Sequence, residues 1–254
     1  MRYPRRSRKN SGQVLIVTSL VVILLLMSTI ICVTELQKNN PIYYDDANKD
    51  LVAVKQAAVN TIISALANIS KGGSPSVIQS DFYRLKSVVL NNSFNSVIDF
   101  DFSASDAAPY SDGVWVSWGS TGEGVSSVLV SFTMNASGIS SNYYTEYVVN
   151  RTSSIDINGF NTVKGTTRTV KVSCTLFNED TPALAGNFTI YYQQTSPTTW
   201  VKLSSPNIID YGNGTYATTF TVEKHLTSNL LPVSIGCQDS RGITVWANTT
   251  CPQQ

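Results

Sequence analysis

Residues 14–33 form an uncharged apolar run, VLIVTSLVVILLLMSTIICV. Because a helix rises about 1.5 Å per residue, a run of this length covers a hydrocarbon core of about 30 Å. We therefore expect a transmembrane helix over 13–36, with membrane lipid as a partner. A secretory signal peptide is the competing interpretation, but its apolar core is usually only about 7–15 residues long, and no obvious small-x-small cleavage site follows this run.

The charges on the two sides of this run predict its orientation. Five cations precede it, whereas the segment that follows is mainly acidic. Cytoplasmic flanks carry the excess of Lys and Arg, so we expect 1–12 to be a basic cytoplasmic segment and 34–254 to be extracellular. Of the 18 Lys and Arg, 13 remain outside against 17 Asp and Glu, so no basic field is available there to hold nucleic acid.

Two amphipathic helices are predicted in a neck over 44–92. The first, from about Asp46 to Ser70, has apolar residues at spacings of three and four. These are Leu51, Val54, Ala58, Ile62, Leu66 and Ile69. Glycines 72–73 end this helix, and Ser74-Pro75 begins the second. Its apolar stripe consists of Ile78, Phe82, Leu85 and Val89.

From residue 94 onwards apolar and polar residues alternate, which is the pattern of strands with one buried face. The predicted strands are 97–102, 114–118, 128–132, 143–149 and 154–157. Turn signals separate them, among them the Asn-Gly pair at 158–159. We therefore expect a small antiparallel sheet over 94–165, on which Tyr143, Tyr144 and Tyr147 are candidates for an interface.

The rest of the chain, 166–251, is predicted to form a second β unit of six or seven short strands at the spacing of a β-sandwich. Within it, Asp210–Tyr216 reads DYGNGTY. This stretch resembles the D-x-G-x-G-T-Y turn and strand of filamin-like and of bacterial or archaeal surface immunoglobulin-like repeats. The resemblance implies an immunoglobulin-like sandwich. The sequence departs from antibody-type domains, because Ile235, two residues before Cys237, stands where their tyrosine corner has Tyr.

Three of the four cysteines belong to this second β unit. Cys174 and Cys237 are in phase with the apolar faces of an early and a late strand, which suits an inter-sheet disulfide in an oxidising compartment. Cys251 is then left over: it is free, pairs with another chain, or replaces one of the other two. Cys32 ends the apolar run and is interpreted as a residue of its apolar face.

The N-terminus is similar to a second family. Arg8 to Gln13 (RKNSGQ), followed by the long apolar helix, resembles the class III signal sequences of archaeal type IV pilin-like proteins and the start of TadE-like pseudopilins. The resemblance implies cleavage between Gly12 and Gln13, a helix from Gln13 in a filament core, and other subunits of a pilus as partners. Val17 stands at the fifth mature position, where many pilins have Glu. A plain membrane anchor explains the same residues, so both interpretations stay open.

We find no catalytic constellation and expect a non-enzymatic protein without a cofactor. His225, the single histidine, is interpreted as a loop residue, and Asp99 with Asp101 as the solvent face of a strand. Asp210 and Asn213 favour a turn over a calcium site. Candidate N-glycosylation sequons begin at Asn68, Asn91, Asn135, Asn150, Asn187, Asn213 and Asn248. They only mildly exceed the number that this composition produces by chance.

Together these features predict an α+β protein with a transmembrane helix, a short helical neck, a small antiparallel sheet and a C-terminal sandwich. We expect a single-pass cell-surface protein with a structural or adhesive role, including that of a pilin-like subunit. The alternative is a receptor or solute-capture ectodomain that binds an unknown extracellular ligand and does not polymerise. An exported hydrolase is a remote alternative.

Overall fold

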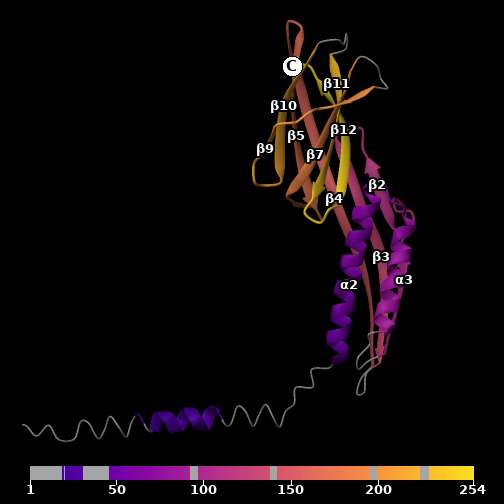
Figure 1. The fold of residues 1–254 in the computed structure, drawn as a ribbon, viewed down its shortest axis with the longest axis vertical. Helices are drawn as coiled ribbons and strands as arrows, with labels where there is room; N and C mark the ends of the chain where they lie inside the picture. Colours follow the sequence, from indigo (N-terminus) through magenta and orange to yellow (C-terminus); the bar gives the residue numbers. More distant parts are fainter. Residues whose placement is uncertain are drawn as a thin grey trace, which may run out of the picture.

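The structure, a computed structural model, describes residues 19, 21–30, 46–91, 97–137, 142–194, 199–223 and 229–254. Two helices lie against one end of a long antiparallel sheet, and a smaller sheet covers the other end (Figure 1). Segment 1–12, the Gly12–Gln13 bond, Cys32 and His225 lie outside the described residues.

The neck consists of α2 (Asp46–Ile69) and α3 (Ser76–Asn91), which confirms the two predicted helices. All six residues of the predicted α2 stripe are buried, and so are Ile78, Phe82 and Val89 of α3. The helix connection follows the capping signals: Gly72 has φ +98°, a conformation open to glycine, and Ser74 Oγ accepts the backbone N–H of Ser76.

The main sheet has the strand order β1-β3-β4-β5-β10-β9, with β2 paired to β3 and β6 paired to β5. Its strands are β1 (Val97–Ala104), β2 (Val114–Trp118), β3 (Glu123–Ser137), β4 (Asn142–Lys164), β5 (Thr167–Asn178), β6 (Thr181–Pro182), β9 (Ile208–Asp210) and β10 (Thr215–Glu223). The small sheet has the order β12-β11-β7-β8. Its strands are β7 (Ala185–Gln193), β8 (Trp200–Lys202), β11 (Leu230–Asp239) and β12 (Thr244–Pro252).

The 23-residue strand β4 joins the two halves of the molecule. Its first part, 142–156, pairs with β3, and its second part, 153–164, pairs with β5. Because side chains alternate along a strand, its odd-numbered residues all face one side. On that side, Val149 packs together with buried residues of α2 and α3, whereas Ile155 and Ile157 pack against the small sheet.

Two hydrophobic cores result. In the first, α2 and α3 pack on β1, β3 and β4, and the rings of Phe82, Phe100 and Phe132 lie 5.1 to 6.0 Å apart. In the second, the main sheet packs face to face with the small sheet. Ile243, from the turn between β11 and β12, is fully buried in the first core and so connects the two.

Two expectations about this region need correction. The boundary expected between 165 and 166 falls at Gly165, in the tight turn from β4 to β5, and the second core already begins within β4. The Asn-Gly pair at 158–159 is not a turn but lies in the middle of β4. Gly159 is needed there because a Cβ would lie 2.8 Å from Cys251 Sγ, so only a glycine lets β12 approach this closely.

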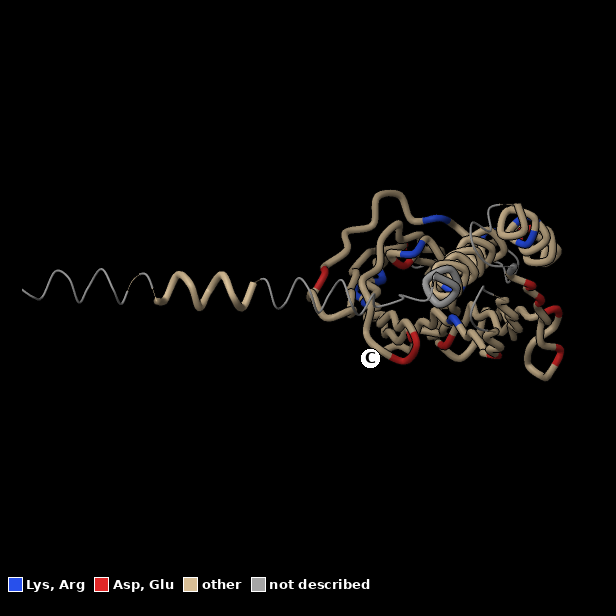
Figure 2. Tube along the Cα trace, turned by 90° about the horizontal axis from the view of Figure 1, so that it is seen from below, with Lys and Arg blue, Asp and Glu red and all other residues tan. Residues whose placement is uncertain are grey.

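The segment Leu51–Ile69 of α2 is long and apolar enough to cross a membrane by composition alone. Its apolar stripe is nevertheless buried against the main sheet, as expected of a core helix. Within the expected span 13–36, residues 21–30 form a helix whose side chains are all exposed. Lys and Arg are spread over the described chain rather than gathered on one face (Figure 2).

Candidate functional site: an aromatic groove

An open groove of about 380 Å³ lies on the outer face of the small sheet. It is lined by Trp118, Tyr191, Trp200, Ser234, Trp246 and Asn248. Five of these residues come from the four strands of the small sheet, and Trp118 ends β2 of the main sheet. Three of the chain's four tryptophans therefore meet at one place.

The aromatic rings form a continuous apolar surface. The Trp246 ring centroid lies 5.7 Å from that of Trp118 and 5.9 Å from that of Tyr191, with interplanar angles of 39° and 38°. Trp118 is 58% exposed and Trp200 41% exposed. Large aromatic side chains are costly to leave in water, and a contiguous exposed apolar patch marks an interaction site.

Glycines hold Trp246 in place. Gly236 lies directly opposite Trp246 in the pairing of β11 with β12. A Cβ on Gly236 would lie 2.5 Å from carbons of the indole ring, so the ring lies flat over the bare backbone of β11. A Cβ on Gly124 would likewise collide with the Trp246 carbonyl oxygen, so the start of β3 approaches the β12 backbone closely.

The hairpin from β2 to β3 carries Trp118 to the groove. The backbone N–H of Asn248 donates to the Gly119 carbonyl at 2.8 Å, and Gly122 N–H donates to the Asn248 carbonyl at 2.9 Å. These two bonds fasten the hairpin to the outer edge of β12. They explain how a tryptophan of the main sheet lines a groove on the small sheet.

The polar groups of the groove are neutral. Ser234 and Asn248 are directly paired across β11 and β12, so their side chains lie side by side on the outer face. The lining residues include no Lys, Arg, His, Asp or Glu. An open apolar surface with a few neutral polar groups is suited to binding a ligand.

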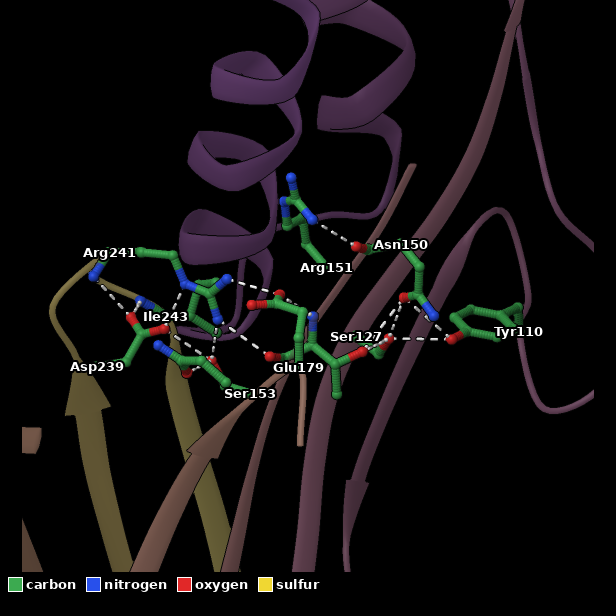
Figure 3. A network of polar contacts seen from close by, with 11 residues as sticks. Tyr110, Ser127, Asn150, Arg151, Ser153, Glu179, Asp239, Arg241 and Ile243 are labelled. Carbon is green, nitrogen blue, oxygen red and sulfur yellow. Dashed lines mark hydrogen bonds and ion pairs between the residues drawn. The ribbon is translucent and has the colours of Figure 1, made fainter. Parts of the chain in front are cut away.

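A partly buried ionic network holds the junction of the two cores (Figure 3). The carboxylate of Asp239 has no exposed side-chain surface and accepts bonds from Arg241 Nε at 2.8 Å and from Ser153 Oγ at 2.8 Å. It also accepts the backbone N–H groups of Arg241 and Ile243 at 2.9 Å. Arg241 reaches Glu179 Oε1 at 2.7 Å. The network thus ties β4, the β5–β6 turn and the β11–β12 turn together.

Burial of the Arg241 guanidinium lowers its pKa, but its hydrogen bonds to Glu179 and Asp239 and their negative charges more than compensate, so the pKa is raised. Arg241 therefore stays charged.

The network continues on the other side of β4. There Asn150 Oδ1 accepts a hydrogen bond from Ser127 Oγ at 3.1 Å, and Ser127 shares a hydrogen bond of 3.0 Å with the Tyr110 hydroxyl. The side chains of Asp239 and Arg241 in this network form their hydrogen bonds with other protein groups, which indicates a structural role.

The cysteines of the second β unit all lie in the second core. The structure records Cys174, Cys237 and Cys251 as free, buried thiols, so the disulfide expected between Cys174 and Cys237 is not formed in it. Burial raises the pKa of Cys174 to about 12 and that of Cys251 to about 11. The pKa of Cys237 is raised by burial and further by neighbouring Cys174 and Asp239.

The acidic residues singled out in the sequence do not converge on one site. Asp99 and Asp101 are exposed on β1 and lie 3.7 and 3.3 Å from Lys86 Nζ of α3. Asp210 Oδ1 accepts the Gly212 N–H at 2.7 Å, as expected of a turn whose side chain bonds its own backbone. Among the residues that the structure describes, no group of three His, Cys, Asp or Glu is placed to hold a metal.

The candidate interface tyrosines separate by face. Tyr143 and Tyr147 pack against the first core, whereas Tyr144 is 69% exposed on the opposite face of β4. Burial raises the pKa of Tyr147 to about 12. Tyr144 is therefore the most exposed of the three, whereas Tyr143 and Tyr147 are half-buried.

The sequons lie in different environments. Six of the seven asparagines are exposed: Asn68, Asn91, Asn135, Asn150, Asn187 and Asn213. Asn248 is half-buried in the groove. Asn187 Nδ2 donates to Gln238 Oε1 at 2.6 Å, so its amide has a partner within the protein. Glycosylation of these sites stays a prediction.

Sequence reasoning missed the groove, because its residues come from five strands and no local pattern joins them. Trp200 and Trp246 each stand on the outward phase of a short strand, which is the one signal that was present. Comparison with protein-family models finds none that matches this chain, and comparison with curated proteins finds no match either.

Proposed function

We propose that this chain is a single-pass, membrane-anchored cell-surface protein whose extracellular part has an adhesive role and makes contact through the aromatic groove. The gathering of Trp118, Trp200 and Trp246 on one open surface supports this proposal most directly. Exposed tryptophans are typical of the energetic centre of binding surfaces. The proposed anchor is the apolar run 14–33, oriented by the cations before it.

The second β unit is proposed to be an immunoglobulin-like sandwich. Two antiparallel sheets around one core support this, as does the turn that carries the D-x-G-x-G-T-Y motif. Gly212 and Gly214 have φ +75° and +82°, which explains the two motif glycines. Tyr216 is buried, and its hydroxyl accepts the Ala185 N–H at 2.7 Å, which explains the final Tyr.

Adhesion by cells that display the full-length chain tests the proposed function. We expect cells with the wild-type chain to adhere to immobilised cell envelopes of the native host, and cells with Trp118→Ala plus Trp200→Ala to lose this adhesion. Tyr211→Ala is the matched control, since Tyr211 is 60% exposed but lies outside the groove lining. Equal adhesion by all three chains at equal surface expression would contradict the proposal.

A pilin-like subunit is the second candidate. The exposed apolar helix of residues 21–30 supports it, because the resemblance to class III signal sequences implies that the helix from Gln13 lies in a filament core. The mature N-terminus of the protein from native membranes separates the candidates. A start at Gln13 supports peptidase processing and a pilin-like subunit, whereas a start at Met1 or Arg2 supports a permanent anchor.

A further inference from the structure

We propose that the aromatic groove binds a neutral saccharide chain. This inference rests on the proposed function and names the ligand class of the same groove. It follows from the length of the groove, from the chemistry of its lining and from the charge around it.

The groove is elongated. Trp246 of β12, Ser234 of β11, Tyr191 of β7 and Trp200 of β8 follow the strand order of the small sheet. Neighbouring strands lie about 4.8 Å apart, so these four residues span about 14 Å across the sheet. Trp118 extends the row beyond β12. Exposed tryptophans therefore stand at both ends of an open row, which suits an extended ligand longer than one ring.

The lining is chemically matched to a sugar. The face of an aromatic ring carries partial negative charge, and a pyranose presents a face of C–H groups with partial positive charge. Indole rings such as those of Trp118 and Trp200 are broad, flat platforms for that face. The Ser234 hydroxyl and the Asn248 amide, which lie side by side, each offer a donor and an acceptor to ring hydroxyls.

The charge in and around the groove disfavours charged ligands. Aromatic cages that bind ammonium groups attract a cation, but Lys202 is directly paired with Tyr191, and its exposed ammonium repels one. The lining residues include no carboxylate that would offset the positive charge of Lys202. Lys202 would attract an anionic group from beside the groove, but the lining itself includes no Arg or Lys to form a direct ion pair with one. An uncharged, polyhydroxylated ligand is complementary to this surface.

Titration of the full-length protein in detergent micelles with cellohexaose, maltohexaose and chitohexaose tests this proposal. We expect at least one of them to produce a saturable change in tryptophan emission. We expect Trp118→Ala and Trp200→Ala each to weaken that binding by about tenfold or more. The Tyr211→Ala protein should bind within about twofold of the wild type, since aromatic removal elsewhere leaves the site unchanged. Unchanged far-UV circular dichroism shows that the variants are folded.

Two outcomes would overturn the proposal. The first is that none of the three neutral hexasaccharides binds. The second is that a proline decamer or an oligogalacturonate binds at the tryptophans while the neutral sugars do not.

The adhesion assay distinguishes failure of this proposal from failure of the proposed function. If adhesion depends on Trp118 and Trp200 but excess cellohexaose, maltohexaose and chitohexaose leave it unchanged, the groove is adhesive and the ligand class is wrong. If the hexasaccharides bind the purified protein but the tryptophan variants adhere like the wild type, the ligand class is right and the adhesive function is wrong.

Discussion

Gly236 and Trp246 face each other across β11 and β12, and the indole ring of Trp246 occupies the space where any other residue at position 236 would have its Cβ. The contact fixes the central ring of the aromatic groove. Because the ring also lies near Trp118 and Tyr191, the position of one glycine sets the shape of the whole apolar surface.

Replacement of Gly236 by Ala is expected to displace the Trp246 ring and to lower the free energy of unfolding by about 1–3 kcal/mol, the usual cost of overpacking. The shift of the ring should also change the tryptophan emission of the folded protein. Gly186→Ala is the control, because Gly186 is in the same sheet and its added Cβ would meet nothing within 4 Å. Equal thermal midpoints for the two variants would show that Trp246 does not depend on Gly236.

The helices of the neck could be predicted because their information is local. The stripe from Leu51 to Ile69 and the cap at Ser74 are determined by residues a few positions apart, and the structure places both as expected. The alternating strands were likewise readable, including the inward phase of Cys174 and Cys237. Periodicity shows which face of an element is buried.

What covers that face is not local information. Asn158-Gly159 has the sequence of a tight turn, yet it continues β4, because pairing with β5 and the approach of Cys251 from β12 outweigh the turn preference. For the same reason the predicted boundary between residues 165 and 166 divides a sheet that is in fact continuous, because β4 pairs with both β3 and β5. The network around Asp239 was also missed, since Glu179, Ser153 and Arg241 come together only through tertiary packing.

Replacement of Asp239 by Asn is expected to lower the free energy of unfolding by about 3 kcal/mol. It leaves the Arg241 charge without one of its two carboxylates, and it places an amide N–H₂ where several donors converge on the buried carboxylate. Asp210→Asn, on the exposed turn, should change the free energy of unfolding by less than about 0.5 kcal/mol, because Asn supports the same turn. Urea unfolding of both variants checks this, and equal losses would contradict a role of the network at the junction.

Replacement of Ile62 by Ala tests whether α2 is a core helix. Ile62 is fully buried against the main sheet, so the cavity should cost about 2–5 kcal/mol. Val52, on the same helix, is 63% exposed, and Val52→Ala should change the free energy of unfolding by less than about 0.5 kcal/mol. If both substitutions had the same small effect, α2 would not pack as described.

The thiols of the second core predict a loss of stability at alkaline pH. In the unfolded chain a thiol ionises near pH 8.5, whereas in the folded protein Cys174 and Cys251 keep their protons up to about pH 12 and 11. The unfolded state therefore binds fewer protons than the folded state above about pH 9, and stability falls as pH rises. The expected loss is about 1.4 kcal/mol per thiol and pH unit between about pH 9 and 11.

The slope of the unfolding free energy against pH also shows whether the Cys174–Cys237 disulfide forms. In reduced protein all three thiols contribute to the slope, whereas a bridge would leave only Cys251. Between about pH 9 and 10 we therefore expect the unfolding free energy of reduced protein to fall about three times as steeply as that of protein oxidised outside the cell. Above about pH 10, buried Tyr147 adds the same slope to both samples. Thiol titration after unfolding without reductant is the independent count: of four cysteines, two should react in the oxidised protein and all in the reduced protein. Four reactive thiols and one common slope in both samples would exclude the bridge.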